Sequence, residues 1–241
     1  MKQQTVRPDM TVGAVVAEYL ATMSMLEALG IDYCCGGKQT LSDAAKTVQI
    51  PVASLLAVLS TTIAQAQQAP AEARDWQTAP LGELMDHIVN VHHAFMHREL
   101  PRIGQLMERV VHAHGAKHGD ILTPLAETYS ALRAELEAHL MDEEERTFPM
   151  IRRLLAGTMD VPVAQAVKEL EHEHEAAGDA LARLRSLSHD YQTPTDACTT
   201  YCALYDALQT LERDLHQHIH LENNVLFPRT RQLLATHEQA A

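Results

Sequence analysis

The sequence predicts an all-α protein in which a small helical domain precedes an antiparallel four-helix bundle. Apolar residues make up 46% of the 241 residues and aromatic residues only 4%, so the core must consist largely of Leu, Val, Ala and Met. These residues suit packed helices better than sheets. A helical period of apolar residues runs through nearly all of the chain and breaks where Gly and Pro cluster. Short connections between the long segments favour an up-down-up-down order.

The charge balance and the cysteine content limit the partners and the compartment. The 32 acidic and 19 basic residues give a formal charge of −13, which argues against a nucleic-acid or anionic-membrane partner. Residues 1–10 are polar, and the apolar residues 11–25 are too few to span a bilayer, so we expect no signal peptide or membrane span. Four cysteines do not make a disulfide scaffold, and we therefore expect a cytoplasmic protein.

The first predicted domain covers residues 1–66. Asp9 is placed to cap a helix over residues 10–29, which would end at Gly30. Residues 31–37 follow as a turn, and the two glycines at its end permit a positive φ. These short elements together predict a small helical unit.

Two further helices complete this domain. Thr40 and Asp43 form a capping-box pattern for a short helix, and Pro51 can occupy the first turn of another. The next segment is rich in Ala and Gln and contains two prolines, so residues 67–80 are predicted to be a linker. The helical bundle is predicted to occupy residues 81–241.

The bundle is predicted from four amphipathic segments, whose inward stripes are read by steps of three and four residues. The first stripe consists of Met85, Val89, His93, Met96, Leu100, Ile103 and Met107. The second consists of Leu125, Tyr129, Leu132, Leu136, His139 and Glu143. The third consists of Val163, Val167, Leu170, His174, Ala177, Leu181 and Leu184. The fourth consists of Leu204, Leu208, Leu211, Leu215, His218 and Glu222.

An internal repeat relates the two halves of the bundle. His139 and His218 each begin the pattern His, three residues, Glu, four residues, Phe-Pro, two residues, Arg, at an offset of 79 residues. His93 and His174 are offset by 81 residues. The bundle is therefore predicted to consist of two helical hairpins, each with one single histidine and one His/Glu pair.

The polar residues of the four stripes predict a metal centre. Residues four apart on a helix have Cβ atoms about 5–6 Å apart, so each His/Glu pair can bind metal from one helix. A buried, unpaired carboxylate costs several kcal/mol, and two metal ions would remove that cost. The predicted ligands are His93, His139, Glu143, His174, His218 and Glu222. A metal-free set of His/Glu hydrogen bonds is the alternative, and recurrence in register across a repeat argues against it.

The ligand types indicate which metals fit. Imidazole and carboxylate suit Fe, Mn or Zn, whereas a thiolate-rich set would indicate structural zinc. Four histidines, two bridging glutamates and one bridging oxygen supply about ten of the roughly twelve bonds of two octahedral ions. About one open position would remain on each ion, so a redox-active pair could bind a small diatomic molecule.

The remaining histidines and two glutamates are assigned by the same stripes. We expect most other histidines to be solvated, some because they fall off the stripes (His87, His92, His172, His216, His220) and some because they lie in loops or at the tail (His112, His114, His118, His189, His237). His97 is a rival ligand because it follows His93 by four residues. Glu135 and Glu173 are candidates to support the ligands or handle protons, with exposed helix glutamates as the alternative.

Five motifs of the sequence have a combined pattern: Asp32-Tyr33-Cys34-Cys35-Gly36-Gly37-Lys38-Gln39-Thr40-Leu41, Asp75-Trp76, residues 139–149, residues 171–178 and residues 218–228. Together they resemble the repair-of-iron-centres family, which are bacterial hemerythrin-like di-iron proteins with a small N-terminal Cys-Cys domain. The likeness covers essentially the whole chain. The pairing of the Asp-Tyr-Cys-Cys-Gly-Gly turn with Leu221-Glu222-Asn223-Asn224-Val225-Leu226-Phe227-Pro228 is specific, since neither half is a generic helix pattern.

This resemblance implies a function in the repair of iron-sulfur clusters damaged by nitric oxide or oxidants. It implies two iron ions, oxo- or hydroxo-bridged, held in the bundle by the same six ligands. The chemistry would be iron donation, or reduction of nitric oxide by a non-haem di-iron oxidoreductase. The expected partners are damaged iron-sulfur proteins, nitric oxide or dioxygen as a small ligand, and an unidentified electron donor.

The four cysteines separate into two groups. By the resemblance, Cys34 and Cys35 would be a transient metal or redox pair, with two small buried residues beside a turn as the alternative. Cys202, four residues after Cys198, departs from the family pattern, and we expect both to be packing residues. Residues 112–120, rich in histidine, look like a local insertion whose role is open.

Two other functions compete with cluster repair. A hemerythrin-like oxygen carrier or sensor would use one more histidine, and His97 could supply it. A zinc-stabilised helical bundle that recruits partners is the structural alternative.

Overall fold

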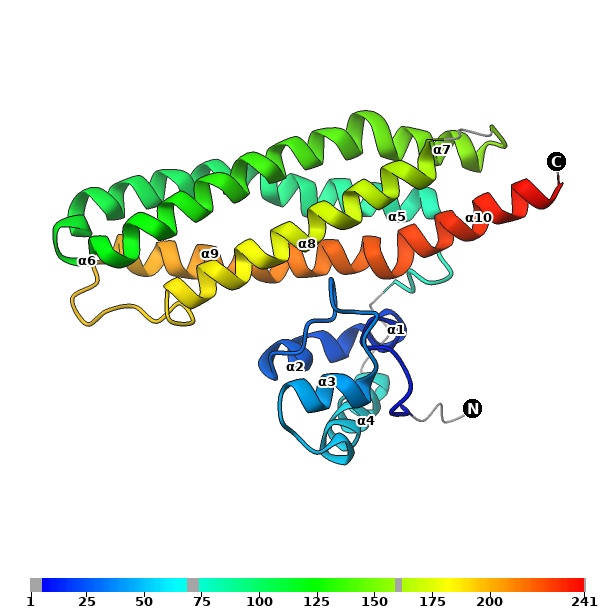
Figure 1. Ribbon diagram of the computed structural model, residues 1–241, viewed down its shortest axis with the longest axis horizontal. Helices are drawn as coiled ribbons and strands as arrows, with labels where there is room; N and C mark the ends of the chain where they lie inside the picture. Colours follow the sequence, from blue (N-terminus) through cyan, green and yellow to red (C-terminus); the bar gives the residue numbers. More distant parts are fainter. Residues whose placement is uncertain (1–5, 69–73, 159–161, 241) are drawn as a thin grey trace. The chain divides into compact units, whose positions relative to one another are not determined.

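The computed structural model describes residues 6–68, 74–158 and 162–240 (Figure 1). Within these ranges the regular structure is helical, apart from one isolated antiparallel bridge between Thr11 and Thr40. The predicted all-α class is therefore confirmed, and the long helices form the predicted antiparallel four-helix bundle.

The first helix of the bundle consists of α5, the π-helical turn η2 and the first half of α6 (Leu81–His87, Ile88–His93, Ala94–Asp142). Within α6, His118 has non-helical angles, φ −120° and ψ 23°, and the chain reverses there. The Tyr129 hydroxyl accordingly donates to the carbonyl of Leu100 at 2.6 Å. The two halves of α6 thus form the first hairpin, as Figure 1 shows.

This reversal corrects the prediction that three histidines lie in a loop. His112, His114 and His118 all belong to α6, and the helix continues up to the reversal. The histidine-rich segment reads as a loop because it contains two glycines and little apolar sequence.

The other three helices of the bundle follow in order. The second half of α6 leads through the π-helical turn η3 (Glu143–Thr147) into α7 (Phe148–Leu155). The third helix is α8 (Val163–Leu187). The fourth consists of α9, the π-helical turn η4 and α10 (Thr199–Leu221, Glu222–Leu226, Phe227–Ala240).

Two of the π-helical turns have a clear cause in the sequence. Pro149 and Pro228 follow η3 and η4, and a proline lacks the N–H that would donate to the carbonyl four residues earlier. Its ring would also clash with that carbonyl in an α-helix, and the wider π turn relieves the clash. The repeated Phe-Pro pair therefore places a π turn directly after each predicted His/Glu pair.

The predicted stripes are buried with one exception. All members of the second, third and fourth stripes are buried, and so are those of the first except Val89. The turn η2 contains more residues per turn than an α-helix, so the buried face passes from Met85 and Ile88 to His92 and His93. The prediction for Val89 is therefore wrong because it assumed an uninterrupted α-helix.

The N-terminal helices differ from the prediction at their start. They are α1, the 3₁₀ turn η1, α2, α3 and α4 (Val12–Glu18, Leu20–Thr22, Met23–Ala28, Leu41–Thr47, Val52–Gln68). A single helix over residues 10–29 is not formed, because Tyr19 leaves the helical region with φ −134° and ψ 77°.

The caps of these helices show one prediction wrong and one confirmed. Thr11 caps α1 by accepting a hydrogen bond from the N–H of Ala14, whereas Asp9 instead pairs with Arg7 at 3.2 Å. Thr40 caps α3 as predicted.

In the turn at residues 31–37, glycine is required because other atoms lie close to its Cα, and not because the backbone has a positive φ. Gly36 and Gly37 both lack a positive φ, whereas Gly30 has φ +68°. A Cβ on Gly37 would lie 2.7 Å from the carbonyl oxygen of Tyr33, and one on Gly36 would lie 3.0 Å from Asp32 Oδ2. These positions exclude a side chain because the turn folds tightly back on itself.

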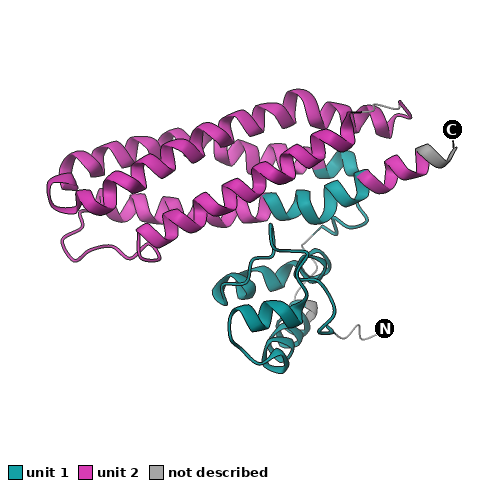
Figure 2. Cartoon of the chain, viewed as in Figure 1, with its two compact units in different colours: residues 1–84, 219–230 teal, residues 85–218, 231–241 magenta. Residues whose placement is uncertain are grey.

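The chain divides into two compact units (Figure 2). One comprises residues 1–84 and 219–230, and the other comprises residues 85–218 and 231–241. The predicted domains, residues 1–66 and 81–241, stay a prediction. The predicted linker, residues 67–80, includes residues 69–73, which lie outside the described residues.

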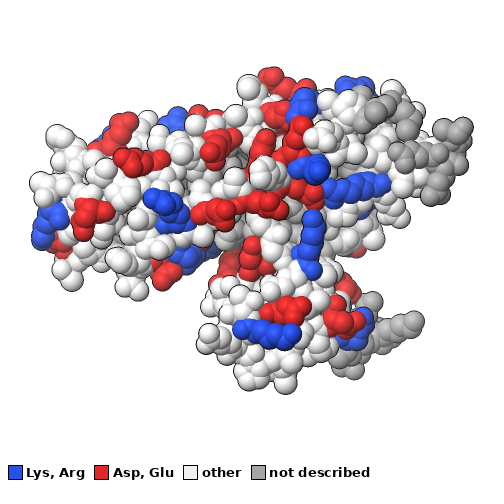
Figure 3. All heavy atoms as spheres, in the orientation of Figure 1, with Lys and Arg blue, Asp and Glu red and all other residues white. Residues whose placement is uncertain are grey.

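The described residues contain no single helix that is long and apolar enough to cross a membrane. The bent pair of α3 and residues 52–66, at 116°, meets the criteria of length and composition when the two helices are taken together. On the face shown in Figure 3, Asp and Glu side chains are spread over the bundle helices with Lys and Arg between them.

Candidate metal centre

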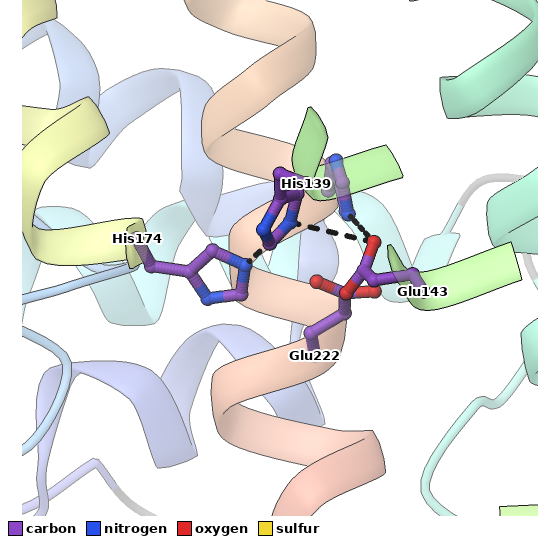
Figure 4. A group of neighbouring side chains, drawn as sticks. His139, Glu143, His174 and Glu222 are labelled. Carbon is purple, nitrogen blue, oxygen red and sulfur yellow. Dashed lines mark hydrogen bonds and ion pairs between the residues drawn. The ribbon is translucent and has the colours of Figure 1, made fainter. Parts of the chain in front are cut away.

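Five of the six predicted ligands form one buried group (Figure 4). One donor atom from each of these side chains lies within 4.8 Å of the others, and all five are buried. The group consists of His139, Glu143, His174, His218 and Glu222. The residues come from three helices of the bundle, and two His/Glu pairs use the one-turn spacing predicted from the sequence.

The sixth predicted ligand, His93, joins the group through Glu143. The Oε2 atom of Glu143 lies 3.2 Å from His93 Nε2, 3.4 Å from His139 Nε2 and 3.6 Å from His218 Nε2. His93 and Glu143 are both fully buried. The structure therefore brings all six predicted residues to one place in the bundle.

Glu143 is a carboxylate that needs a cation. Among the described residues, neither of its buried oxygens accepts a hydrogen bond of normal geometry. Burial opposes its ionisation, but the imidazoles of His139, His218 and His93 together hold its pKa well below the usual range. An ionised carboxylate in a buried site without hydrogen bonds is costly, and a bound metal ion removes that cost.

His174 faces His139 with a spacing typical of metal ligands. Their Nε2 atoms lie 3.2 Å apart, and their ring centroids lie 4.9 Å apart. Two imidazole nitrogens at this distance cannot both point lone pairs at each other without a proton or a cation between them. The donor set of imidazole and carboxylate therefore fits a metal such as iron, manganese or zinc.

Two further carboxylates hold the ligand rings from outside. Glu173 Oε2 lies 2.7 Å from His139 Nδ1, and Glu144 Oε1 lies 2.8 Å from His93 Nδ1. In this arrangement Nδ1–H donates to the carboxylate, so that the lone pair of Nε2 is directed to the centre. Glu173 is thus at the predicted place for supporting a ligand.

The sequence prediction missed Glu144. The run of glutamates at residues 143–145 was the available signal, but a regular α-helix would not have directed two neighbouring side chains to the same histidine, His93. The π turn η3 places Glu143 inward, while Glu144 reaches both His93 and His97 at its edge.

Glu135 and His97 do not join the centre. Glu135 is exposed, and it forms no hydrogen bond or ion pair with the described residues. The side chain of His97 is 55% exposed, and its Nε2 lies 3.2 Å from Glu144 Oε1. The fifth histidine ligand expected for an oxygen carrier is therefore absent from the described group.

Two histidines that were expected to be solvated are buried. His92 stacks on His218 with ring centroids 6.0 Å apart, and its Nδ1 lies 3.1 Å from Asp214 Oδ1. His220 is fully buried, and burial lowers its pKa to about 4. The expectation fails because η2 widens the buried face around His92 and because His220 packs edge-on against Tyr33. His172 is 86% exposed, as expected.

Cys34 and Cys35 form a separate small group with Asp32. The Asp32 carboxylate accepts hydrogen bonds from the backbone N–H groups of Cys34, Cys35 and Gly36 at 2.8–3.1 Å. The two sulfur atoms are 3.8 Å apart and do not form a disulfide. The hydrogen bond with Cys35 and burial raise the pKa of Cys34 well above its usual value. The group has the donor types of a metal site, and its predicted role stays a prediction.

Sequence comparisons relate both parts of the chain to known proteins. Residues 84–230 match the family described as Hemerythrin HHE cation binding domain, and residues 8–62 match a domain of unknown function, DUF542. The chain is 36% identical to the iron-sulfur cluster repair protein YtfE of Pectobacterium carotovorum subsp. carotovorum, over 92% of this chain and 96% of the relative. Proteins of the same name from Citrobacter koseri and Escherichia coli O157:H7 are 35% and 34% identical over the same shares.

Proposed function

We propose that this chain, which belongs to the family of YtfE iron-sulfur cluster repair proteins and carries a hemerythrin HHE cation-binding domain, helps to repair iron-sulfur clusters damaged by nitric oxide or oxidants. The observation that carries the proposal is the buried His/Glu group, because it has the donor types of an iron site in a chain related to repair proteins along 92% of its length. Damaged iron-sulfur proteins would be its targets.

The proposed cofactor is a pair of iron ions, held by six residues. These residues are His93, His139, Glu143, His174, His218 and Glu222. Two ferrous ions with open positions would supply electrons and a binding place for a small diatomic molecule. Glu143 is directed at three of the four histidines, which supports a bridging role for its carboxylate.

The supporting carboxylates give the buried histidines a path to solvent. The side chain of Glu173 is 51% exposed and that of Glu144 is 34% exposed, while their imidazole partners are buried. Each carboxylate can therefore hold the Nδ1 proton of its histidine and exchange protons with water. Reduction of nitric oxide requires protons and an external electron donor, whereas iron donation requires that ligand histidines be reprotonated on release. The same carboxylates would serve either chemistry.

A hemerythrin-like oxygen carrier or sensor is the second candidate function. It would need another histidine at the centre, and His97 is exposed and held by Glu144 instead. The described structure therefore favours the set of four histidines and two glutamates, and with it the repair function.

The cofactor is tested by anaerobic purification followed by metal analysis and visible spectroscopy. We expect about two irons per chain and oxo-bridged ferric bands that bleach on reduction. His218→Ala should lose iron because it removes a buried member of the group, and His216→Ala, which lies off the buried stripe, should retain it. Zinc without a visible band, or equal iron loss in both variants, would overturn the assignment.

The two chemistries are separated with the same iron-loaded protein. Iron donation predicts that anaerobic mixing with an apo iron-sulfur protein restores its cluster absorption while the chain loses iron. Nitric oxide reduction predicts consumption of nitric oxide with an added reductant while the iron content stays constant. Stable, reversible dioxygen binding without either reaction would favour the carrier function.

A further inference from the structure

Side chains of types that can bind metal also meet where α6 reverses. The Nε2 atom of His114 lies 3.2 Å from Cys198 Sγ, and that of His118 lies 3.1 Å from Asp196 Oδ1. His118 precedes His139 by 21 residues on α6, so this group is about 30 Å from the first centre along the helix. It is therefore a separate site and not an extension of the His/Glu group.

The distances within each pair are close to those between two ligands of one ion, but the pairs are separate, because no three of these four described donors lie within 4.8 Å of one another. With metal bonds of about 2.0–2.3 Å, two ligands of a tetrahedral ion lie roughly 3.2–3.8 Å apart. The His114–Cys198 and His118–Asp196 pairs are both close to this range. The two imidazole rings have centroids 6.3 Å apart, and both rings pack beside Tyr201.

The four donors form two pairs, and rotation of the side chains could bring all four around one ion. Cys198 is exposed, and the side chain of Asp196 is 36% exposed, so both can turn toward a common point without disturbing the core. Asp196 and Cys198 are two residues apart in the α8–α9 connection, and His114 and His118 are four apart on α6. Each segment therefore contributes two ligands from one side.

The charges of the group suit a divalent cation. A hydrogen bond from Lys117 and a second from His118 lower the pKa of Asp196 to about 2. His114 and the backbone N–H groups of Tyr201 and Thr200 lower the pKa of Cys198 to about 7. A carboxylate and a thiolate together neutralise a divalent ion, while the two imidazoles bind as neutral ligands.

We propose that His114, His118, Asp196 and Cys198 form a zinc site that fastens the α8–α9 connection to the reversal of α6. One sulfur, two nitrogens and one oxygen are a typical tetrahedral zinc set, with a softer donor than the His/Glu centre contains. This corrects the expectation that Cys198 and Cys202 are packing residues, since both are exposed.

The test uses cobalt(II) as a spectroscopic probe for zinc on the full-length, iron-loaded protein. A Cys34→Ser/Cys35→Ser background removes the other cysteine pair, and occupied iron sites leave this group as the available one. We expect one equivalent of cobalt to produce a thiolate-to-metal charge-transfer band that added zinc abolishes. Cys198→Ser should remove the band, and the matched change Cys202→Ser, one helical turn later, should leave it intact.

The imidazole and carboxylate ligands are tested by affinity. His114→Ala, His118→Ala and Asp196→Asn should each weaken zinc binding by about 10- to 100-fold or more, because even residues that only support a ligand have effects of that size. Iron content serves as the control that each variant is folded. The proposal is overturned if the parent shows no thiolate band, if the band survives in Cys198→Ser, or if Cys198 alone accounts for the affinity.

Discussion

At the scale of single residues, Glu143 shows why the bundle needs a cation. Its side chain is fully buried, and three imidazole nitrogens lie 3.2–3.6 Å from one of its oxygens. In the absence of metal, the carboxylate and its neighbours must share protons in a confined space. With a metal ion bound, each of these nitrogen and oxygen atoms has a cation to which it can donate an electron pair. The stability of this part of the core is thus linked to the presence of the ion.

His220 gives a second residue-scale consequence, which concerns pH. Burial lowers its pKa to about 4, so the folded chain keeps it neutral while the unfolded chain takes up a proton below about pH 6.5. The unfolded state therefore binds more protons between these values, and the free energy of unfolding falls as pH drops from about 6.5 to 4. The contribution is on the order of 1 kcal/mol per pH unit.

We predict that His220→Gln makes the pH dependence of stability weaker. Glutamine cannot take up this proton, but its amide oxygen can still accept the hydrogen bond that Asn224 donates to His220 Nδ1. The measurement is urea unfolding of the metal-free protein at pH 7 and pH 5. The variant should lose about 1–2 kcal/mol less than the parent between these values. His172→Gln, at an exposed position, is the control, and an equal change in both variants would refute this origin.

At the scale of secondary-structure elements, the helix caps are the clearest local determinants. Thr11 has extended backbone angles, and its hydroxyl accepts from the N–H of Ala14 at the start of α1. Asp9 lies two residues earlier and pairs with Arg7 on the surface. The helix therefore begins after the residue whose hydroxyl reaches an N–H of the first turn and not after the preceding acidic residue.

We predict different costs for removing these two side chains. Thr11→Ala should lower the free energy of unfolding of the small domain by about 1 kcal/mol, because it leaves an N–H of the first turn without its partner. Asp9→Ala should cost less than Thr11→Ala, since surface ion pairs contribute little. Thermal or urea unfolding monitored by circular dichroism compares the two variants. A larger loss for Asp9→Ala would show that the cap lies where the sequence first indicated.

The π-helical turns are the elements that set the direction of the ligands. Each includes one of the proposed ligands, as η2 ends at His93, η3 begins at Glu143 and η4 begins at Glu222. The wider turn rotates the following residues relative to an α-helix, so the side chains before and after it face the core differently. This explains why Glu144 and His92 have contacts that a regular helical register does not predict.

At the scale of the whole molecule, the metal centre links distant parts of the chain. His93 and Glu222 are 129 residues apart in sequence, so the proposed ligands span most of the bundle. An ion bound by such residues stabilises the folded state because the unfolded chain cannot bring them together. The same reasoning applies to the proposed zinc site at the reversal of α6.

We predict that removing metal lowers the melting temperature of the protein. At a free metal concentration of 100 times the Kd, binding contributes about 2.7 kcal/mol. For a chain of this size, that corresponds to roughly 5–10 °C in Tm. Calorimetry of the chelated and reloaded protein provides the measurement, with His218→Ala as the variant that should show little difference between the two. Equal melting of the chelated and loaded parent would contradict the role of the ions in the core.

The sequence by itself determined the helical class, the four stripes and the six residues that the structure brings together. These features follow from spacings of three and four residues, because such spacings place side chains on one face of a helix whatever the rest of the chain does. The recurrence of His139–Glu143 as His218–Glu222 separated the predicted ligands from the other histidines, because both pairs occupy the same register of a repeat. Thr40 was identifiable as a cap for the same local reason.

Only the tertiary structure decided the remaining features. The reversal at His118, the pairing of Glu144 and Glu173 with ligand histidines, and the burial of His92 and His220 all depend on contacts between segments far apart in sequence. The meeting of His114 with Cys198, 84 residues later, is of the same kind. The periodicity of apolar residues indicates which face of a helix is buried. It does not indicate which segment packs against that face, because that depends on the packing of the whole chain.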